Sequence, residues 1–155
     1  MPENPAGLEL DGAAVILYTS DKVLLHKRDS RPRLFPNRWA IFGGGVEPGE
    51  TPEETACREL KDELGYQLSP QDLEPLGRFR VSAPSHRYIV HYFRAKLSQD
   101  FWDILLKLNA IDHPEREGEG IALFSHDEID YLNLVCQDRV ALERHFRGAD
   151  FGFIE

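Results

Sequence analysis

The segment from residue 43 to residue 66 constrains the fold of this chain more than any other. It reads GGGVEPGETPEETACRELKDELGY, so a glycine-rich turn stands directly before a short acidic stretch. Thr51 is expected to cap a helix, with Pro52 at the first helical position and Glu54 closing a capping box. Gly65 stands where a glycine commonly ends a helix. The segment therefore predicts a short helix that follows a glycine turn and is capped at both ends.

The predicted helix has two faces of different character. Because Glu59, Asp62 and Glu63 stand at i, i+3 and i+4, they project from one side. The opposite side, suited to packing against a sheet, is formed by Cys57, Leu60 and Leu64. Like charges at these spacings destabilise a bare helix by a few tenths of a kcal/mol per pair. A hard divalent cation would turn that repulsion into coordination and could bind phosphate, although the three acids alone fit a solvated face equally well.

The loop before the helix favours the metal site. Its glycines allow tight turns and close approach to a ligand, and Glu50 stands just before the cap. Counted from Gly44, the segment resembles the signature of the MutT/Nudix hydrolases. That signature is glycine, five residues, glutamate, seven residues, then Arg-Glu-apolar-x-Glu-Glu-x-Gly-apolar. The matching positions are Gly44, Glu50, Arg58, Glu59, Leu60, Glu63, Gly65 and Tyr66.

Two residues depart from the family's pattern. Asp62 stands where the family has the first glutamate of its pair, which moves a carboxylate back by one methylene. Asp62 could bind metal through a water or hold a second metal less well, so the number of cations stays open. Phe42 occupies a position where many relatives have proline, and a core aromatic at the end of a strand is the favoured interpretation.

The resemblance implies an α+β fold, an α/β/α sandwich around a mixed β-sheet in which the signature forms a loop–helix–loop metal site. It implies Mg²⁺, with Mn²⁺ as an alternative. An acid in the loop after residue 112 would complete the metal shell or act as general base, with Glu117 as first choice and Glu119 as second. The expected catalytic residues are Glu50, Arg58, Glu59, Glu63 and Glu117, with Arg58 orienting its neighbours. The expected metal ligands are Gly44, Glu59, Asp62, Glu63, Glu117 and Glu119.

Candidates for substrate binding stand mostly before the signature. Arginines crowd the loop that leads to it and could clamp a phosphate chain: Arg28, Arg31, Arg33 and Arg38. Gly44 and Gly45 could approach the substrate through their backbone. Aromatic residues that could stack on a base, although each alone is more often part of a core, are Phe35, Trp39, Phe79 and Tyr88. Histidines that could titrate near neutral pH, although each is more often structural, are His26, His86 and His91.

Composition indicates one compact domain. A chain of 155 residues is long enough for a real core, with residues 1–11 expected as a flexible lead-in and 12–155 as the domain. The net charge of −9 argues against a nucleic-acid polymer as partner. The first residues show neither a signal peptide nor a membrane span, so we expect a cytoplasmic protein. Cys57 and Cys136 are expected to be reduced, buried thiols.

The remaining sequence predicts several short strands and helices. Strands are expected at 13–18, 22–27, 39–42, 76–81, 88–97 and 121–124, with 76–81 and 88–97 forming a hairpin. Helices are expected at 101–109, 126–132 and 134–146, the second capped by Ser125.

These features together predict an enzyme that cleaves a phosphoanhydride bond in a nucleoside diphosphate linked to another group. The favoured interpretation is a (d)NTP pyrophosphohydrolase, including the 8-oxo-dGTP type, that acts as a monomer or homodimer on a small nucleotide. A nucleotide-sugar or ADP-ribose pyrophosphatase is the alternative, because the segment 98–114 could reshape the pocket. A nucleotide-binding sensor without turnover and a structural cation site are the non-enzymatic alternatives.

Overall fold

The computed structural model describes residues 9–27, 38–82, 87–107, 120–148 and 152–154. Its strands are β1 (Glu9–Tyr18), β2 (Lys22–Lys27), β3 (Trp39–Ala40), β4 (Phe42–Gly45), β5 (Glu74–Ser82), β6 (Arg87–Lys96), β7 (Gly120–Ser125) and β8 (Gly152–Ile154). Its helices are α1 (Pro52–Leu64), η1 (Pro70–Asp72), α2 (Gln99–Lys107), α3 (His126–Ile129) and α4 (Cys136–Phe146).

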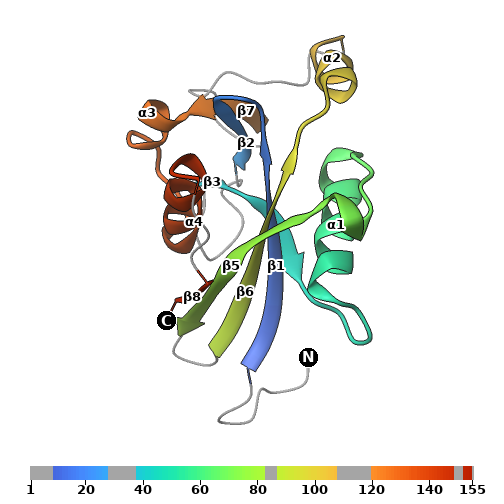
Figure 1. The fold of residues 1–155 in the computed structure, drawn as a ribbon, viewed down its shortest axis with the longest axis vertical. Coiled ribbons are helices and arrows are strands. Elements are labelled where there is room, and N and C mark those ends of the chain that lie inside the picture. Colours follow the sequence, from blue (N-terminus) through green and yellow to red (C-terminus); the bar gives the residue numbers. More distant parts are fainter. Residues whose placement is uncertain (1–8, 28–37, 83–86, 108–119, 149–151, 155) are drawn as a thin grey trace.

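The eight strands form one mixed sheet. Its main order is β3-β2-β1-β6-β5-β8, while β4 pairs with β1 and β7 pairs with β2. The β1–β6 and β5–β8 pairs are parallel, and the other pairs are antiparallel. Figure 1 shows α1 and α4 on opposite sides of this sheet. The predicted α/β/α sandwich around a mixed sheet is thus confirmed.

Strand β1 lies at the centre and supplies both hydrophobic cores. Its side chains alternate between faces, as the pleat of a strand requires. Ala14 and Ile16 pack in the cluster that includes Leu142 of α4, whereas Val15 packs in the cluster that includes Leu60 of α1. The sheet therefore holds α1 and α4 in fixed positions relative to the same strand.

Several predicted boundaries differ from the structure. Strand β1 begins at Glu9, inside the segment expected as a lead-in, because it pairs with β6 from Glu9 onward. The strand expected at 39–42 is two strands, because the chain changes pairing partner at Ile41. Helix α3 ends at Ile129, before the predicted end at residue 132. Helix α4 begins at Cys136, after the segment around Leu134 has bridged to Trp39.

Within the described part of the chain, no helix is long and apolar enough to cross a membrane. The side chain of Cys57 is partly buried and forms no disulfide, and burial raises the pKa of its thiol.

Candidate active site

Helix α1 has the ends that the sequence predicts. Thr51 caps it, and reciprocal hydrogen bonds join the side chain and backbone of Thr51 to those of Glu54. At the other end, Gly65 adopts a left-handed conformation with φ of 74°, and its N–H donates to the carbonyl of Lys61. These caps fix the start and direction of the helix, so the positions of its acidic side chains are set relative to the glycine strand β4.

Glycine at positions 43 and 44 lets α1 and β1 approach β4 closely. A Cβ on Gly43 would lie 2.8 Å from the Cα of Ala14, so a side chain there would collide with β1. A Cβ on Gly44 would lie 2.6 Å from Cδ of Glu59. The carboxylate of Glu59 therefore rests directly on the backbone of Gly44, which joins the acidic helix to the glycine strand.

Arg58 holds two carboxylates at the start of this site. Its Nε and Nη2 donate to the two oxygens of Glu50 at 2.8 and 3.0 Å, and its Nη1 donates to Glu59 Oε1 at 2.8 Å. Its Nη2 also donates to the carbonyl of Gly45 at 3.1 Å. The hydrogen bonds to Glu50 raise the pKa of the Arg58 guanidinium, so this side chain stays charged. Arg58 is thus placed to orient its neighbours.

Glu50 is fully engaged by groups of the protein. Besides Arg58, the hydroxyl of Thr55 donates to Glu50 Oε1 at 2.6 Å and the N–H of Glu47 donates to it at 3.1 Å. These hydrogen bonds, with Arg58 first, lower the pKa of Glu50 from 4.5 to about 2. These contacts fit a role for Glu50 in orienting its neighbours better than a role as a metal ligand.

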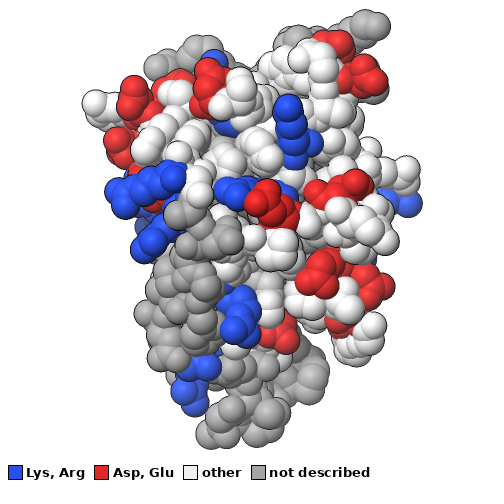
Figure 2. Space-filling view, in the orientation of Figure 1, with Lys and Arg blue, Asp and Glu red and all other residues white. Residues whose placement is uncertain are grey.

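The other two acids of the helix face are more exposed than Glu59. Asp62 is 4.0 Å from Arg58 Nη1 and its side chain is 63% exposed, and Glu63 is exposed as well. Figure 2 shows acidic side chains gathered over the α1 side of the molecule. In the part of the chain that the structure describes, no three His, Cys, Asp or Glu side chains are grouped closely enough to hold a metal ion. The predicted loop acids Glu117 and Glu119 lie outside the described residues.

The donor atoms nevertheless suit a hard cation. The carboxylates of Glu59, Asp62 and Glu63 and the backbone carbonyls of the glycine strand are all oxygen donors, which Mg²⁺ and Mn²⁺ prefer. Glu59 gives one oxygen to Arg58 and so keeps its second oxygen for other contacts. The oxygen of Glu59 that lies nearest to Gly44 is this same Oε1, so a cation on the second oxygen would lie one carboxylate away from β4.

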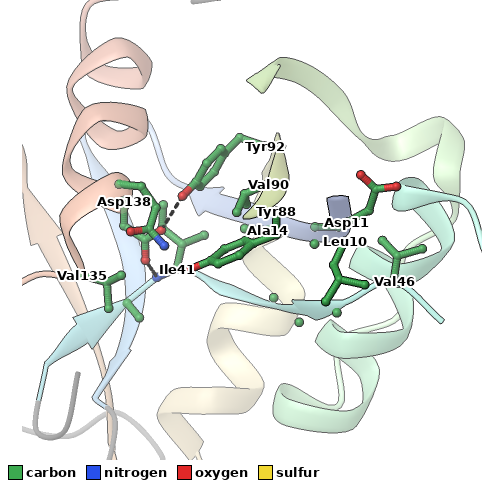
Figure 3. A pocket seen from close by; sticks show the side chains of 17 residues that line it. Leu10, Asp11, Ala14, Ile41, Val46, Tyr88, Val90, Tyr92, Val135 and Asp138 are labelled. Atoms are coloured by element: carbon green, nitrogen blue, oxygen red, sulfur yellow. Dashed lines mark hydrogen bonds between the residues drawn. The ribbon is translucent and has the colours of Figure 1, made fainter. Parts of the chain in front are cut away.

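A pocket of about 500 Å³ opens along the same glycine strand, within the usual size range of ligand sites. Its walls come from the start of β1, from β4, from β6 and from the start of α4. The lining residues are Leu10–Ala14, Ala40, Ile41, Gly43–Val46, Tyr88, Val90, Tyr92, Val135, Gln137 and Asp138. In Figure 3 the ring of Tyr88 lies across the middle of this pocket. The pocket and Glu59 thus share Gly44.

A buried carboxylate forms one end of the pocket. Asp138 is 6% exposed; its Oδ1 accepts from the hydroxyl of Tyr92 at 2.7 Å and its Oδ2 accepts from the N–H of Ile41 at 3.0 Å (Figure 3). Burial, and then the charge of Asp138, raise the pKa of Tyr92 well above 10 and also raise the pKa of Tyr88. Both phenols therefore keep their protons at neutral pH and can donate hydrogen bonds.

The predicted substrate-binding residues divide into three groups. Gly44, Gly45 and Tyr88 line the pocket. Trp39 does not, which corrects its assignment as a stacking residue: it is 5% exposed and packs edge-on against Phe124 in the core on the α4 side. Arg38 is half-buried just before β3 and is not among the lining residues. The substrate-binding candidates outside the described residues are Arg28, Arg31, Arg33 and Phe35, and His86 lies outside them as well.

Three further predictions concern the neighbouring strands. Phe42 is 1% exposed in the core on the α1 side, as its interpretation as a core aromatic requires. His26 packs against the ring of Phe42, and Nε2 of His91 lies 3.3 Å from Oδ1 of Asp11. Phe79 packs against the core on the α4 side.

The sequence reasoning missed Asp138, Tyr92 and Gln137. An acidic residue in the first turn of a helix is ordinary, because it interacts favourably with the helix dipole. Asp138 therefore gives no separate signal in the sequence, and only the fold shows that it is buried against β4.

Comparisons with known proteins agree with this geometry. A family model for the NUDIX domain matches residues 9–144 of the chain. This chain therefore belongs to the MutT/Nudix hydrolase family. Members of this family generally use divalent metal ions.

Individual relatives resemble parts of the chain or its fold. The nucleoside triphosphatase NudI of Enterobacter sp. (strain 638) is 43% identical over 60 residues, which are 39% of this chain and 43% of that protein. NudI of Salmonella newport (strain SL254) is 50% identical over 52 residues, which are 34% of this chain and 37% of that protein. The matches thus span less than half of these curated relatives.

Solved structures share the fold at low sequence identity. A MutT NUDIX hydrolase from Burkholderia pseudomallei superposes with a TM-score of 0.66 at 22% identity, covering 88% of this chain and 97% of that one. A MutT protein from Methanosarcina mazei Go1 gives 0.66 at 18% identity, covering 94% and 98%. At such identities the likeness concerns the fold.

Proposed function

We propose that this protein is a metal-dependent Nudix hydrolase that cleaves a phosphoanhydride bond of a nucleoside triphosphate, releasing a nucleoside monophosphate and pyrophosphate. The observation that carries the proposal is the position of Gly44, which lines the pocket on one side and touches Glu59 on the other. A nucleoside in the pocket would place its phosphates along β4 toward the acids of α1. The similarity to NudI supports a triphosphate as substrate.

The pocket suits the nucleoside part of such a substrate. Its walls are mainly apolar, while Gln137, Asp138 and the hydroxyl of Tyr88 offer polar groups for orientation. Tyr88 is half-buried on β6 and is the aromatic residue we propose to stack on the base. The cleaved triphosphate would belong to a standard or an oxidised nucleotide, including 8-oxo-dGTP.

The acids of α1 would hold the metal ion. Glu59 and Glu63 would be its protein ligands, Asp62 and the backbone of Gly44 would assist, and Glu117 or Glu119 would supply a further carboxylate. Mg²⁺, or Mn²⁺ in its place, neutralises phosphate charge and lowers the pKa of a bound water. Arg58 stays charged, keeps Glu50 ionised and holds one oxygen of Glu59, which would leave the other oxygen to bind the metal ion.

A panel of nucleotides tests the proposal. The protein is incubated with nucleoside triphosphates, nucleotide sugars, ADP-ribose and dinucleoside polyphosphates, with Mg²⁺ or Mn²⁺ or a chelator, and the products are identified by mass. We expect monophosphate and pyrophosphate from a triphosphate, only with metal. Cleavage of ADP-ribose or a nucleotide sugar alone would shift the substrate class, and binding without any product would indicate a sensor.

A further inference from the structure

Ile41 stands where the chain changes its partner in the sheet. The residue before it, Ala40, pairs with His26 of β2, and the residue after it, Phe42, pairs with Val15 of β1. The N–H of Ile41 donates to the carboxylate of Asp138, 97 residues further along the chain. The side chain of Asp138 on α4 thus accepts a hydrogen bond from the backbone N–H that lies between β3 and β4.

Further backbone hydrogen bonds connect the residues just before α4 to β3. The N–H of Trp39 donates to the carbonyl of Asn133 at 2.9 Å, and the N–H of Val135 donates to the carbonyl of Trp39 at 3.2 Å. Asp138 makes the next contact in this series, two residues further along the β3–β4 segment. The carboxylate of Asp138 is held in turn by a hydrogen bond from the hydroxyl of Tyr92, a residue that is 1% exposed.

Strand β4 has little freedom beyond this switch. Gly43 lies so close to β1 that a Cβ would reach the backbone of Ala13 and Ala14, and Gly44 lies against Glu59. Because interiors are packed closely, we expect a displacement of Ile41 to be passed along β4 to Gly44. The contact between Asp138 and Ile41 therefore bears on the spacing between Gly44 and Glu59.

We propose that Asp138 is a positioning residue for the hydrolytic site: by holding the N–H of Ile41 it fixes where β4 begins and hence how Gly44 meets Glu59. The inference rests on the proposed function of α1 as the metal-binding helix. Asp138 acts here through the backbone of β4. A direct contact between Asp138 and the base is a different role, and the two roles affect different kinetic constants.

Two variants separate the contact to Ile41 from the contact to Tyr92. Tyr92→Phe removes the hydroxyl and keeps the carboxylate on Ile41. Adding Asp138→Leu to it removes the acceptor for Ile41 as well, without leaving the tyrosine hydroxyl buried and unsatisfied. Asp138→Asn is the conservative variant, because its carbonyl oxygen can still accept from Ile41.

Amide hydrogen exchange in the metal-free protein measures the contact itself. Relative to Tyr92→Phe, we expect the double variant to exchange the amide of Ile41 at least ~10-fold faster. Asp138→Asn should retain most of the protection. Unchanged exchange at Ile41 in the double variant would overturn the proposal, whatever the activity of the protein.

Kinetics and metal titration then measure the consequence. At saturating substrate, the double variant should lose ~10–100-fold in kcat relative to Tyr92→Phe and need more Mn²⁺ for half-maximal activity, with KM changed by less than ~3-fold. Asp138→Asn should recover most of this loss. A rise in KM alone would overturn the positioning role in favour of base contact, and faster exchange with unchanged kcat would also overturn it.

The experiments distinguish a failure of the positioning role from a failure of the proposed function. If the unmodified protein hydrolyses no nucleotide, the proposed function fails, whereas Mn²⁺ affinity measured by titration still tests the positioning role. Weaker Mn²⁺ binding in the double variant than in Tyr92→Phe would support it, and equal binding would contradict it.

Discussion

Arg58 binds Glu50 through two parallel hydrogen bonds: Nε donates to one carboxylate oxygen at 2.8 Å and Nη2 donates to the other at 3.0 Å. Such two-pronged contacts are stronger and more directional than single ones. They join the loop before α1 to the middle of the helix. Because Arg58 also contacts Glu59, this pair sets the geometry from which the proposed chemistry starts.

The ion pair between Arg58 and Glu50 predicts how the stability of the folded protein depends on pH. The folded protein lowers the pKa of Glu50 from 4.5 to about 2, so the stabilisation is complete above pH 4.5 and is lost as the pH falls toward 2. Glu50→Gln should lower the Tm at neutral pH, and its difference from the unmodified protein should shrink over that range. Thermal unfolding between pH 2 and 7 measures this, with Glu53→Gln on the same helix as control. A difference that stays constant with pH would contradict the assignment.

Glu63 should be needed for turnover and not for folding. Glu63 is exposed near the end of α1, so Glu63→Gln should leave the Tm within a few degrees. Loss of a charged metal ligand removes several kcal/mol of electrostatic stabilisation, so kcat should fall at least ~100-fold. Steady-state kinetics with Mg²⁺ and Mn²⁺ measure this, again beside Glu53→Gln. Activity retained in Glu63→Gln would remove this residue from the mechanism.

Alanine at the three glycines of β4 should give three different results. Gly43→Ala places a methyl group against the backbone of β1 and should impair folding. Gly44→Ala meets the movable carboxylate of Glu59, so the fold should persist while kcat falls ~10–100-fold and more metal is required. Among the described residues Gly45→Ala meets no atom within 4 Å, so this variant should lose much less activity. Circular dichroism and metal-dependent kinetics distinguish these results, and equal losses at Gly44 and Gly45 would argue against the contact with Glu59.

The buried ring of His145 predicts a second change of stability with pH, in a higher pH range than that of Glu50. Burial, and then the charge of Arg94, lower the pKa of His145 from 6.5 to about 4, and Glu74 opposes this shift. The ring packs against Tyr18 and Phe146, and within the described residues its Nδ1 is buried without a hydrogen-bond partner. The unfolded chain takes up the proton first, so stability should fall as the pH drops from 6.5 to 4.

His145→Phe removes the titrating group and should flatten the stability curve between pH 4 and 6.5, while the loss below pH 4.5 from Glu50 persists. Chemical unfolding at several pH values measures both ranges in one series. A curve for His145→Phe that stays parallel to that of the unmodified protein would show that another group titrates there.

The sequence predicted the features that depend on neighbouring residues. Both caps of α1 and the antiparallel pairing of β5 and β6 are confirmed. These features depend on capping residues and on the alternation of apolar and polar residues within short stretches of sequence. The family resemblance is confirmed for the same reason, since the signature lies within one loop and one helix.

Features that depend on distant contacts were missed. The division between β3 and β4 at Ile41 arises from pairing with two different strands and from Asp138 near the other end of the chain. Trp39 was a candidate for stacking with the core as the more common alternative, and its contact with Phe124 shows its place in the core. The sequence predicts that Arg58 orients its neighbours, but the choice of Glu50 as its partner depends on how the loop before α1 folds.

The most direct measurement is the location of Mn²⁺ by its anomalous scattering in crystals grown with a non-hydrolysable nucleoside triphosphate. We predict an ion within ~2.2 Å of carboxylate oxygens of Glu59 and Glu63, beside the backbone of Gly44 and in contact with the phosphates. An ion bound elsewhere, with Glu59 and Glu63 turned away from it and the phosphates, would contradict the account.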